Sequence, residues 1–155
     1  MRCRLTTLLL ALLLFAVPTP ALAANPFQRL AHRSFQGRSI VGTQGRHPVQ
    51  HPADVDVFFR WVELNGYHAG TPTVYWNSGC NGHDYLLTVG HQRLHTYEEI
   101  KTQKQCTGQQ KLEEHWLERF FVADPTWSLA EGRLTLASGP RRVILVGKWK
   151  LGTNS

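Results

Sequence analysis

Acidic residues are missing from the first third of this sequence, since none of the 11 Asp and Glu residues precedes Asp54. From Asp54 onward, acidic and basic residues balance. The chain therefore lacks the strongly basic domain surface that a nucleic-acid-binding protein needs. Internal repeats, low-complexity tracts and a Gly-x-Ser-x-Gly nucleophile motif are also missing. Beyond the N-terminus, the sequence has no apolar run of the roughly 20 residues that a membrane-spanning helix requires.

The N-terminus has the three parts of a secretory signal. Two arginines precede an apolar run over residues 5–17, and Ala21-Leu22-Ala23 then gives the small-x-small pattern of a cleavage site. The run is too short for a bilayer span, so a retained anchor is the weaker alternative. Cys3 lies before the run, which disfavours a lipoprotein. We predict a signal peptide over residues 1–23 and an exported mature chain.

Cleavage would leave two cysteines, Cys80 and Cys106. An even pair in an exported chain indicates one disulfide, and the alternative is two buried free thiols. A bridge closing a loop of about 27 residues would stabilise the fold by roughly 3.5 kcal/mol in the chain-entropy model. Together with the signal peptide, this predicts a soluble monomer in an oxidising envelope compartment, most simply a bacterial periplasm.

Residues 24–53 form a basic segment without clear hydrophobic periodicity. They contain the whole basic excess of the predicted mature chain, as Arg29, Arg33, Arg38 and Arg46. We predict a flexible arm that serves as a solvated linker. The alternative is weak attraction to an anionic surface such as lipid, lipopolysaccharide or cell wall.

The pattern changes at Asp54, where we predict that a single domain, 54–155, begins. Apolar and alternating segments predict strands over 55–64, 72–76, 85–89 and 94–101, with a turn at Asn65-Gly66. A helix is then predicted over 108–122. Its apolar stripe would include Leu112, Trp116 and Phe120, and Thr107 with Gln110 would form its capping box.

A β-meander follows the predicted helix. A turn at Glu131-Gly132 would pair Leu129 with Leu134 and Trp127 with Leu136, and a last strand would cover 141–146. Strands, one helix and more strands predict a mainly antiparallel α+β fold. We expect a strongly curled sheet or partly open β-barrel, with the helix covering one opening.

Several short motifs occur in the order of a known family. They are a Trp-x-x-Leu-x-Gly segment from Trp61 to Gly66, the turn Gly79-Cys80-Asn81, a Thr102…Cys106 stretch and the helical Glu113. In this order the chain resembles the META domain, the HslJ-like family, over about residues 59–147. The resemblance implies a cracked-barrel fold, an envelope location and a link to stress tolerance, and it implies no known reaction.

The resemblance and the lack of a catalytic constellation predict a non-enzymatic protein without a cofactor. Its partner would be a protein or another component of the envelope. The alternative is a carrier that holds a small hydrophobic ligand inside the barrel. Trp76, Trp116 and Trp127, with Trp61, would then line the cavity.

The titratable residues give two further expectations. His83-Asp84 could form an Asp-oriented imidazole. No four ligands have structural zinc spacing, and His91 and His95 flank a predicted turn, so we expect no metal site. Glu113 would be an anchor that hydrogen-bonds a strand or loop; the alternative is a polar group at the mouth of an apolar cavity.

Overall fold

Eight antiparallel strands form one sheet in the computed structural model, which describes residues 25–43, 47–62 and 70–148. The predicted signal peptide, Arg46 and the Asn65-Gly66 turn lie outside these residues. The strand order is β5-β4-β3-β2-β1-β8-β7-β6. The strands are β1 (Arg33–Val41), β2 (Asp56–Trp61), β3 (Pro72–Asn77), β4 (Gly82–Val89), β5 (Leu94–Lys101), β6 (Thr126–Ala130), β7 (Arg133–Ser138) and β8 (Arg141–Gly147). The helical elements are α1 (Gly108–Phe121) and the short 3-10 helices η1 (Pro26–Arg29) and η3 (Pro52–Asp54).

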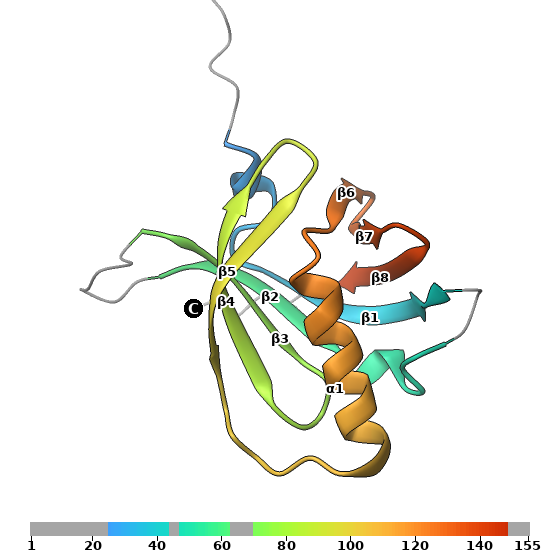
Figure 1. Cartoon of the computed structure of the whole chain (residues 1–155). Helices are drawn as coiled ribbons and strands as arrows, with labels where there is room; N and C mark the ends of the chain where they lie inside the picture. Colours follow the sequence, from blue (N-terminus) through green and yellow to red (C-terminus); the bar gives the residue numbers. More distant parts are fainter. Residues whose placement is uncertain (1–24, 44–46, 63–69, 149–155) are drawn as a thin grey trace, which may run out of the picture.

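The two edge strands of the sheet, β5 and β6, meet at one end. Arg93 forms an isolated antiparallel bridge with Thr126. Beside it, the Leu94 amide donates to the Pro125 carbonyl, and the Trp127 amide donates to the Gln92 carbonyl, both at 2.9 Å. The sheet is therefore strongly curled, and α1, which connects β5 to β6, lies across its open side (Figure 1). This confirms the predicted fold class.

The prediction of a flexible arm over 24–53 is wrong, because this segment contributes a central strand. β1 pairs with both β2 and β8, and Phe35 and Ile40 on β1 are buried. A β-bulge between Gly37 and Ser39 breaks the alternation that would have identified the strand. Gly37 also packs so closely beneath η3 that a Cβ would overlap the Pro52 carbonyl. The domain thus begins well before Asp54.

Helix α1 has the predicted position but a different buried face. Leu117, Phe120 and Phe121 are fully buried, whereas Leu112 is 66% exposed. The predicted stripe is therefore wrong at Leu112, because the first turns of α1 bury two glutamates, Glu113 and Glu114, instead. The capping box is wrong as well, since Thr107 makes no side-chain hydrogen bond to the helix. Within the described residues, no helix is long and apolar enough to cross a membrane.

The β-meander has the predicted register. Leu129 is opposite Leu134, and Trp127 is opposite Leu136. Leu134, Leu136 and Trp127 are all buried in the core. A short polar turn with period-2 strands on both sides was sufficient to fix this hairpin, because a slip of one residue would expose the whole apolar set.

Candidate functional site

Asn81 connects three parts of the chain from the β3–β4 turn. Its Oδ1 accepts hydrogen bonds from the Lys104 amide at 2.8 Å and from Thr102 Oγ1 at 3.0 Å. Its Nδ2 donates to the Glu114 carboxylate on α1, at 3.0 and 3.2 Å to the two oxygens. The Cys80–Cys106 disulfide lies beside it, with the two Cα atoms 6.1 Å apart. One amide and one disulfide thus fasten the β5–α1 connection and α1 to the sheet.

A fully buried imidazole lies behind this amide. His83 Nδ1 is 2.6 Å from Glu99 Oε1, and His83 Nε2 is 3.0 Å from Glu114 Oε1. The ring is stacked on Trp76 at a centroid distance of 3.8 Å. A carboxylate can only accept, so the two contacts require an imidazolium or a proton on one carboxyl group. In both cases the three groups together carry one negative charge.

The neighbours of Glu99 keep its carboxyl group ionised near neutral pH. Burial, the hydrogen bond that Tyr85 donates to Glu99 at 2.7 Å and nearby carboxylates raise the pKa of Tyr85 well above its usual value. Burial would raise the pKa of Glu99, but hydrogen bonds from His83 and Tyr85 and the charge of Lys101 bring that pKa below 4.5. Burial would lower the pKa of Lys101, but Glu99 and Glu118 outweigh it and raise that pKa. Near neutral pH, Tyr85 is protonated, Glu99 ionised and Lys101 charged.

The partner predicted for His83 is wrong. Asp84 forms an ion pair with Arg60 on the other face of the sheet, because successive residues of a strand point in opposite directions. Glu99 and Glu114 orient the imidazole instead. Glu114 was not predicted as a site residue, although it is spaced three and seven residues from the buried Leu117 and Phe121. That spacing places all three on one face of a helix.

Glu113 is an anchor, as expected, and lies away from the His83 cluster. Its Oε1 accepts hydrogen bonds from the backbone N–H of Gln50 at 3.0 Å and from Gln109 Nε2 at 2.8 Å. The carboxylate therefore holds the segment before η3 against the first turn of α1. The two adjacent glutamates of the helix fasten different parts of the fold.

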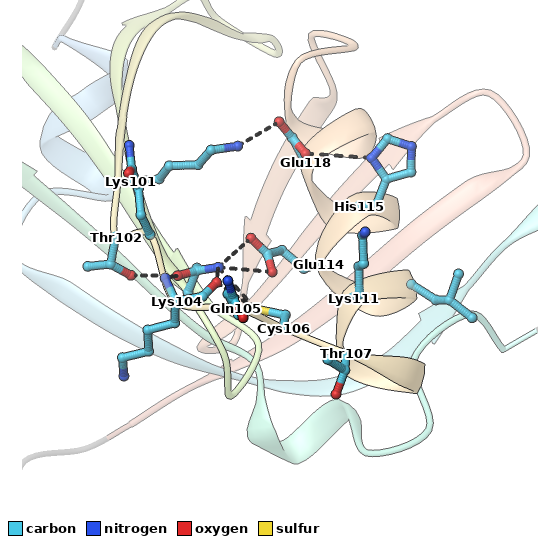
Figure 2. A pocket seen from close by; sticks show the side chains of 13 residues that line it. Lys101, Thr102, Lys104, Gln105, Cys106, Thr107, Lys111, Glu114, His115 and Glu118 are labelled. Carbon is cyan, nitrogen blue, oxygen red and sulfur yellow. Dashed lines mark hydrogen bonds and ion pairs between the residues drawn. The ribbon is translucent and has the colours of Figure 1, made fainter.

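A cleft of about 680 Å³ separates α1 from the β5–α1 connection (Figure 2). Asn81 and Glu114 form part of its wall, and Lys101 reaches across to Glu118 at 3.5 Å. Lys104 and Lys111 also line it, and neither forms an ion pair within the described part of the chain. The exposed Leu112 belongs to the same lining. We call this hollow the helix cleft.

A second cleft, of about 550 Å³, crosses the outer face of β2 to β5, and we call it the sheet cleft. Phe58 and Tyr75, which are opposite each other on β2 and β3, line it together with Ile100. Ile100 is 76% exposed. Lys101 and Thr102 line both clefts. The end of β5 therefore forms a ridge between them, which we call the β5 ridge (residues 100–102).

The tryptophans predicted to line a ligand cavity lie elsewhere. Trp76 and Trp127 belong to the buried core, and Trp116 is half-buried against Phe120. None of the three lines the helix cleft or the sheet cleft. Trp61 packs edge-on against Phe27, with ring centroids 4.6 Å apart. The carrier function stays a prediction without support from these residues.

One group in the described residues has metal-ligand spacing. It comprises Cys80, Cys106 and Glu114, whose ligand atoms lie within 4.8 Å of one another. The two sulfur atoms are bonded to each other in the disulfide, so neither is available as a thiolate ligand.

Comparisons with known proteins identify the fold alone. No protein-family model matches the chain, and no curated protein sequence matches it. An NMR structure from Burkholderia xenovorans is 14% identical, with a TM-score of 0.58, and the match covers 96% of this chain and 99% of that one. Another NMR structure is 17% identical, with a TM-score of 0.52, over 77% of this chain and 92% of the other.

Proposed function

We propose that this chain is an exported, non-enzymatic binding protein that docks a protein partner over the β5 ridge. One observation carries the proposal. The two most exposed large apolar side chains of the described residues, Ile100 and Leu112, lie one in each cleft. Apolar side chains gathered around clefts and rimmed by polar residues are typical of protein-binding surfaces.

The burial of the His83 cluster favours a binding function over a catalytic one. His83 is fully buried, and both of its ring nitrogens are engaged by glutamates. A general base must reach the proton that it abstracts, and no substrate atom could approach this imidazole. The cluster instead supports the wall between the two clefts, which keeps the β5 ridge in a fixed position.

The same geometry supports membership of the META/HslJ-like family. Four of the motif positions converge although they are far apart in sequence. Asn81 contacts Thr102, Cys106 and α1, and Cys80 is bonded to Cys106. The helical glutamate at this point is Glu114, one residue after the position that the resemblance indicated. A shared fastening of the helix to the sheet would explain why such motifs occur together.

The disulfide is consistent with an oxidising compartment. Together with the N-terminal signal, it supports a place in the bacterial periplasm and a role in envelope integrity under stress. The unpaired Lys104 and Lys111 beside Leu112 favour a partner that presents an apolar group flanked by acidic residues.

Replacing both cleft residues tests the proposal. Cells that lack the chromosomal copy would be complemented with wild-type protein or with the Ile100→Ser/Leu112→Ser variant, and grown under heat and detergent stress. We expect the variant to fold normally, because both side chains are exposed, and to lose complementation.

Val122→Ser is the matched control, since Val122 is 52% exposed at the opposite, C-terminal end of α1 and lines neither cleft. Full complementation by the double variant, at equal protein level, would contradict docking at the β5 ridge. An equal loss of complementation in Val122→Ser would show that removing any exposed apolar side chain impairs function, whether or not it lines a cleft.

A further inference from the structure

The fold separates charge between two groups of strands. Residues 25–43, 47–53 and 126–148, which include β1, β6, β7 and β8, contain seven Lys and Arg and one acidic residue, Glu131. The other described residues, 54–62 and 70–125, contain six basic and nine acidic residues. Because β1 lies beside β8 in the sheet, basic residues from both ends of the sequence come together (Figure 1).

The outer face of β7 and β8 is the part of this region that is free of acidic side chains. Its outward positions alternate with buried leucines and valines. They are Arg133, Thr135 and Ala137 on β7 and Arg142, Ile144 and Val146 on β8. Arg133 is opposite Val146, and Arg142 is opposite Ala137. Arginines therefore border a patch of short, largely uncharged side chains.

Arg38 extends this surface onto β1. It is exposed at the β-bulge, next to Ser39, which is opposite Ile144. Within the described residues, Arg38, Arg133 and Arg142 form no ion pair. Three other cations of the region are engaged elsewhere: Arg29 lies over the Trp127 ring at 5.4 Å, Arg141 lies over the Phe120 ring at 5.8 Å, and Lys148 pairs with Asp56. We call the three free arginines and the patch between them the basic face.

We propose that the basic face docks on an anionic phospholipid surface. Guanidinium groups bind phosphate oxygens with paired hydrogen bonds, and no carboxylate of the face competes for them. The short side chains between the arginines leave all three exposed guanidinium groups accessible from outside the sheet. Val146, 36% exposed, and Ile144 would contact the acyl boundary of the leaflet. Three separate arginines on β1, β7 and β8 fit an array of phosphates better than a single anionic ligand.

This surface differs from the one first expected from the sequence. Arg29 and Arg33 were expected to act in a flexible arm, but Arg29 is held against Trp127, and Arg33 is opposite Phe59, whose side chain points into the core. Only Arg38 of the described arm residues belongs to the basic face. The other two arginines, Arg133 and Arg142, come from the C-terminal meander, more than 90 residues away from Arg38 in the sequence.

Vesicle co-sedimentation tests the proposal. The exported protein, with its N-terminus checked by mass spectrometry so that the apolar run of residues 5–17 does not contribute, is mixed with phosphatidylcholine vesicles. These contain either no phosphatidylglycerol or about 30 mol% of it. We expect binding only to the anionic vesicles at about 0.05 M salt, and its loss at about 0.5 M, where screening is strong.

Two matched variants locate the contact. Arg133→Gln/Arg142→Gln should weaken vesicle binding about 30-fold, because each basic residue near an anionic leaflet contributes about fivefold. Lys104→Gln/Lys111→Gln removes the same charge from the helix cleft and should change binding less than about twofold. If both variants weaken vesicle binding equally, binding depends on the net charge of the protein, and the proposal of a basic face is overturned.

Absence of salt-sensitive binding to the anionic vesicles would also overturn the proposal. Retention of a short DNA duplex with no retention of vesicles would do the same, since it would identify the face as a different kind of anion site. Circular dichroism of each variant confirms that the fold is intact. Because Arg38, Arg133 and Arg142 line neither cleft, failure of the basic face leaves docking at the β5 ridge untouched.

Discussion

Replacing Asn81 with Ala should release α1 and the β5–α1 connection from the sheet. The side chain is 5% exposed, and it exchanges bonds with Glu114, Thr102 and Lys104. A hydrogen bond to a carboxylate contributes about 1.5–3 kcal/mol and each neutral bond about 1 kcal/mol. We expect the free energy of unfolding to fall by about 3.5–5 kcal/mol. At about 4 °C per kcal/mol, this corresponds to a decrease of about 14–20 °C in Tm.

The assay is urea and thermal unfolding of protein whose disulfide is verified by mass spectrometry. Asn77→Ala is the matched control, because Asn77 lies in the same hairpin and its side chain makes two neutral hydrogen bonds: Oδ1 accepts from the Gly79 amide, and Nδ2 donates to the Tyr75 hydroxyl. It should cost only about 1–2 kcal/mol. Asn81→Asp should be at least as damaging as Asn81→Ala near neutral pH, since it places a second carboxylate against Glu114. A loss below about 1 kcal/mol for Asn81→Ala would refute the role of this amide.

Three further changes test other parts of the account. Cys80→Ala/Cys106→Ala should lower the free energy of unfolding by about 3.5 kcal/mol in the chain-entropy model, measured by urea titration; an unchanged midpoint would contradict a closed bridge. Gly37→Ala should cost about 2 kcal/mol, because its methyl group would meet the Pro52 backbone, and no loss of Tm would mean that β1 is not held beneath η3. The pKa of Glu99 is below its ordinary 4.5, so Glu99 stabilises the fold fully above about pH 4.5, and this contribution is lost as pH falls through the lowered pKa. Stability measured against pH should therefore fall less steeply on the acid side in Glu99→Gln, and an identical acid slope would exclude this contribution.

The sequence was sufficient for the features that depend on local pattern. The hairpin around Glu131-Gly132 has an unbroken period of two on both strands, so its register could be read directly. The bounds of β5 and nearly those of α1 followed in the same way. The cysteine pairing followed from the two cysteines that remain once the predicted signal peptide is set aside.

The predictions from the sequence that the structure contradicts failed for physical reasons. β1 is broken by a bulge and contains a buried glycine, so its apolar period is too short to recognise. The partners of His83 come from β5 and α1, at separations of 16 and 31 residues, which no local pattern reveals. Leu112 fits the helical stripe in the sequence but lies over a cleft, because the first turns of α1 face a polar cluster. The candidate site therefore became visible only in three dimensions.

The most direct test of partner docking is photo-crosslinking in living cells. A photoreactive amino acid would be placed at Leu112, in the helix cleft, and separately at Ser128, which is exposed on β6 away from both clefts. The account predicts one discrete crosslinked band from position 112 that disappears when Ile100→Ser is introduced, and no such band from position 128. Crosslinking that is equal at the two positions, or that persists unchanged with Ile100→Ser, would contradict docking over the β5 ridge.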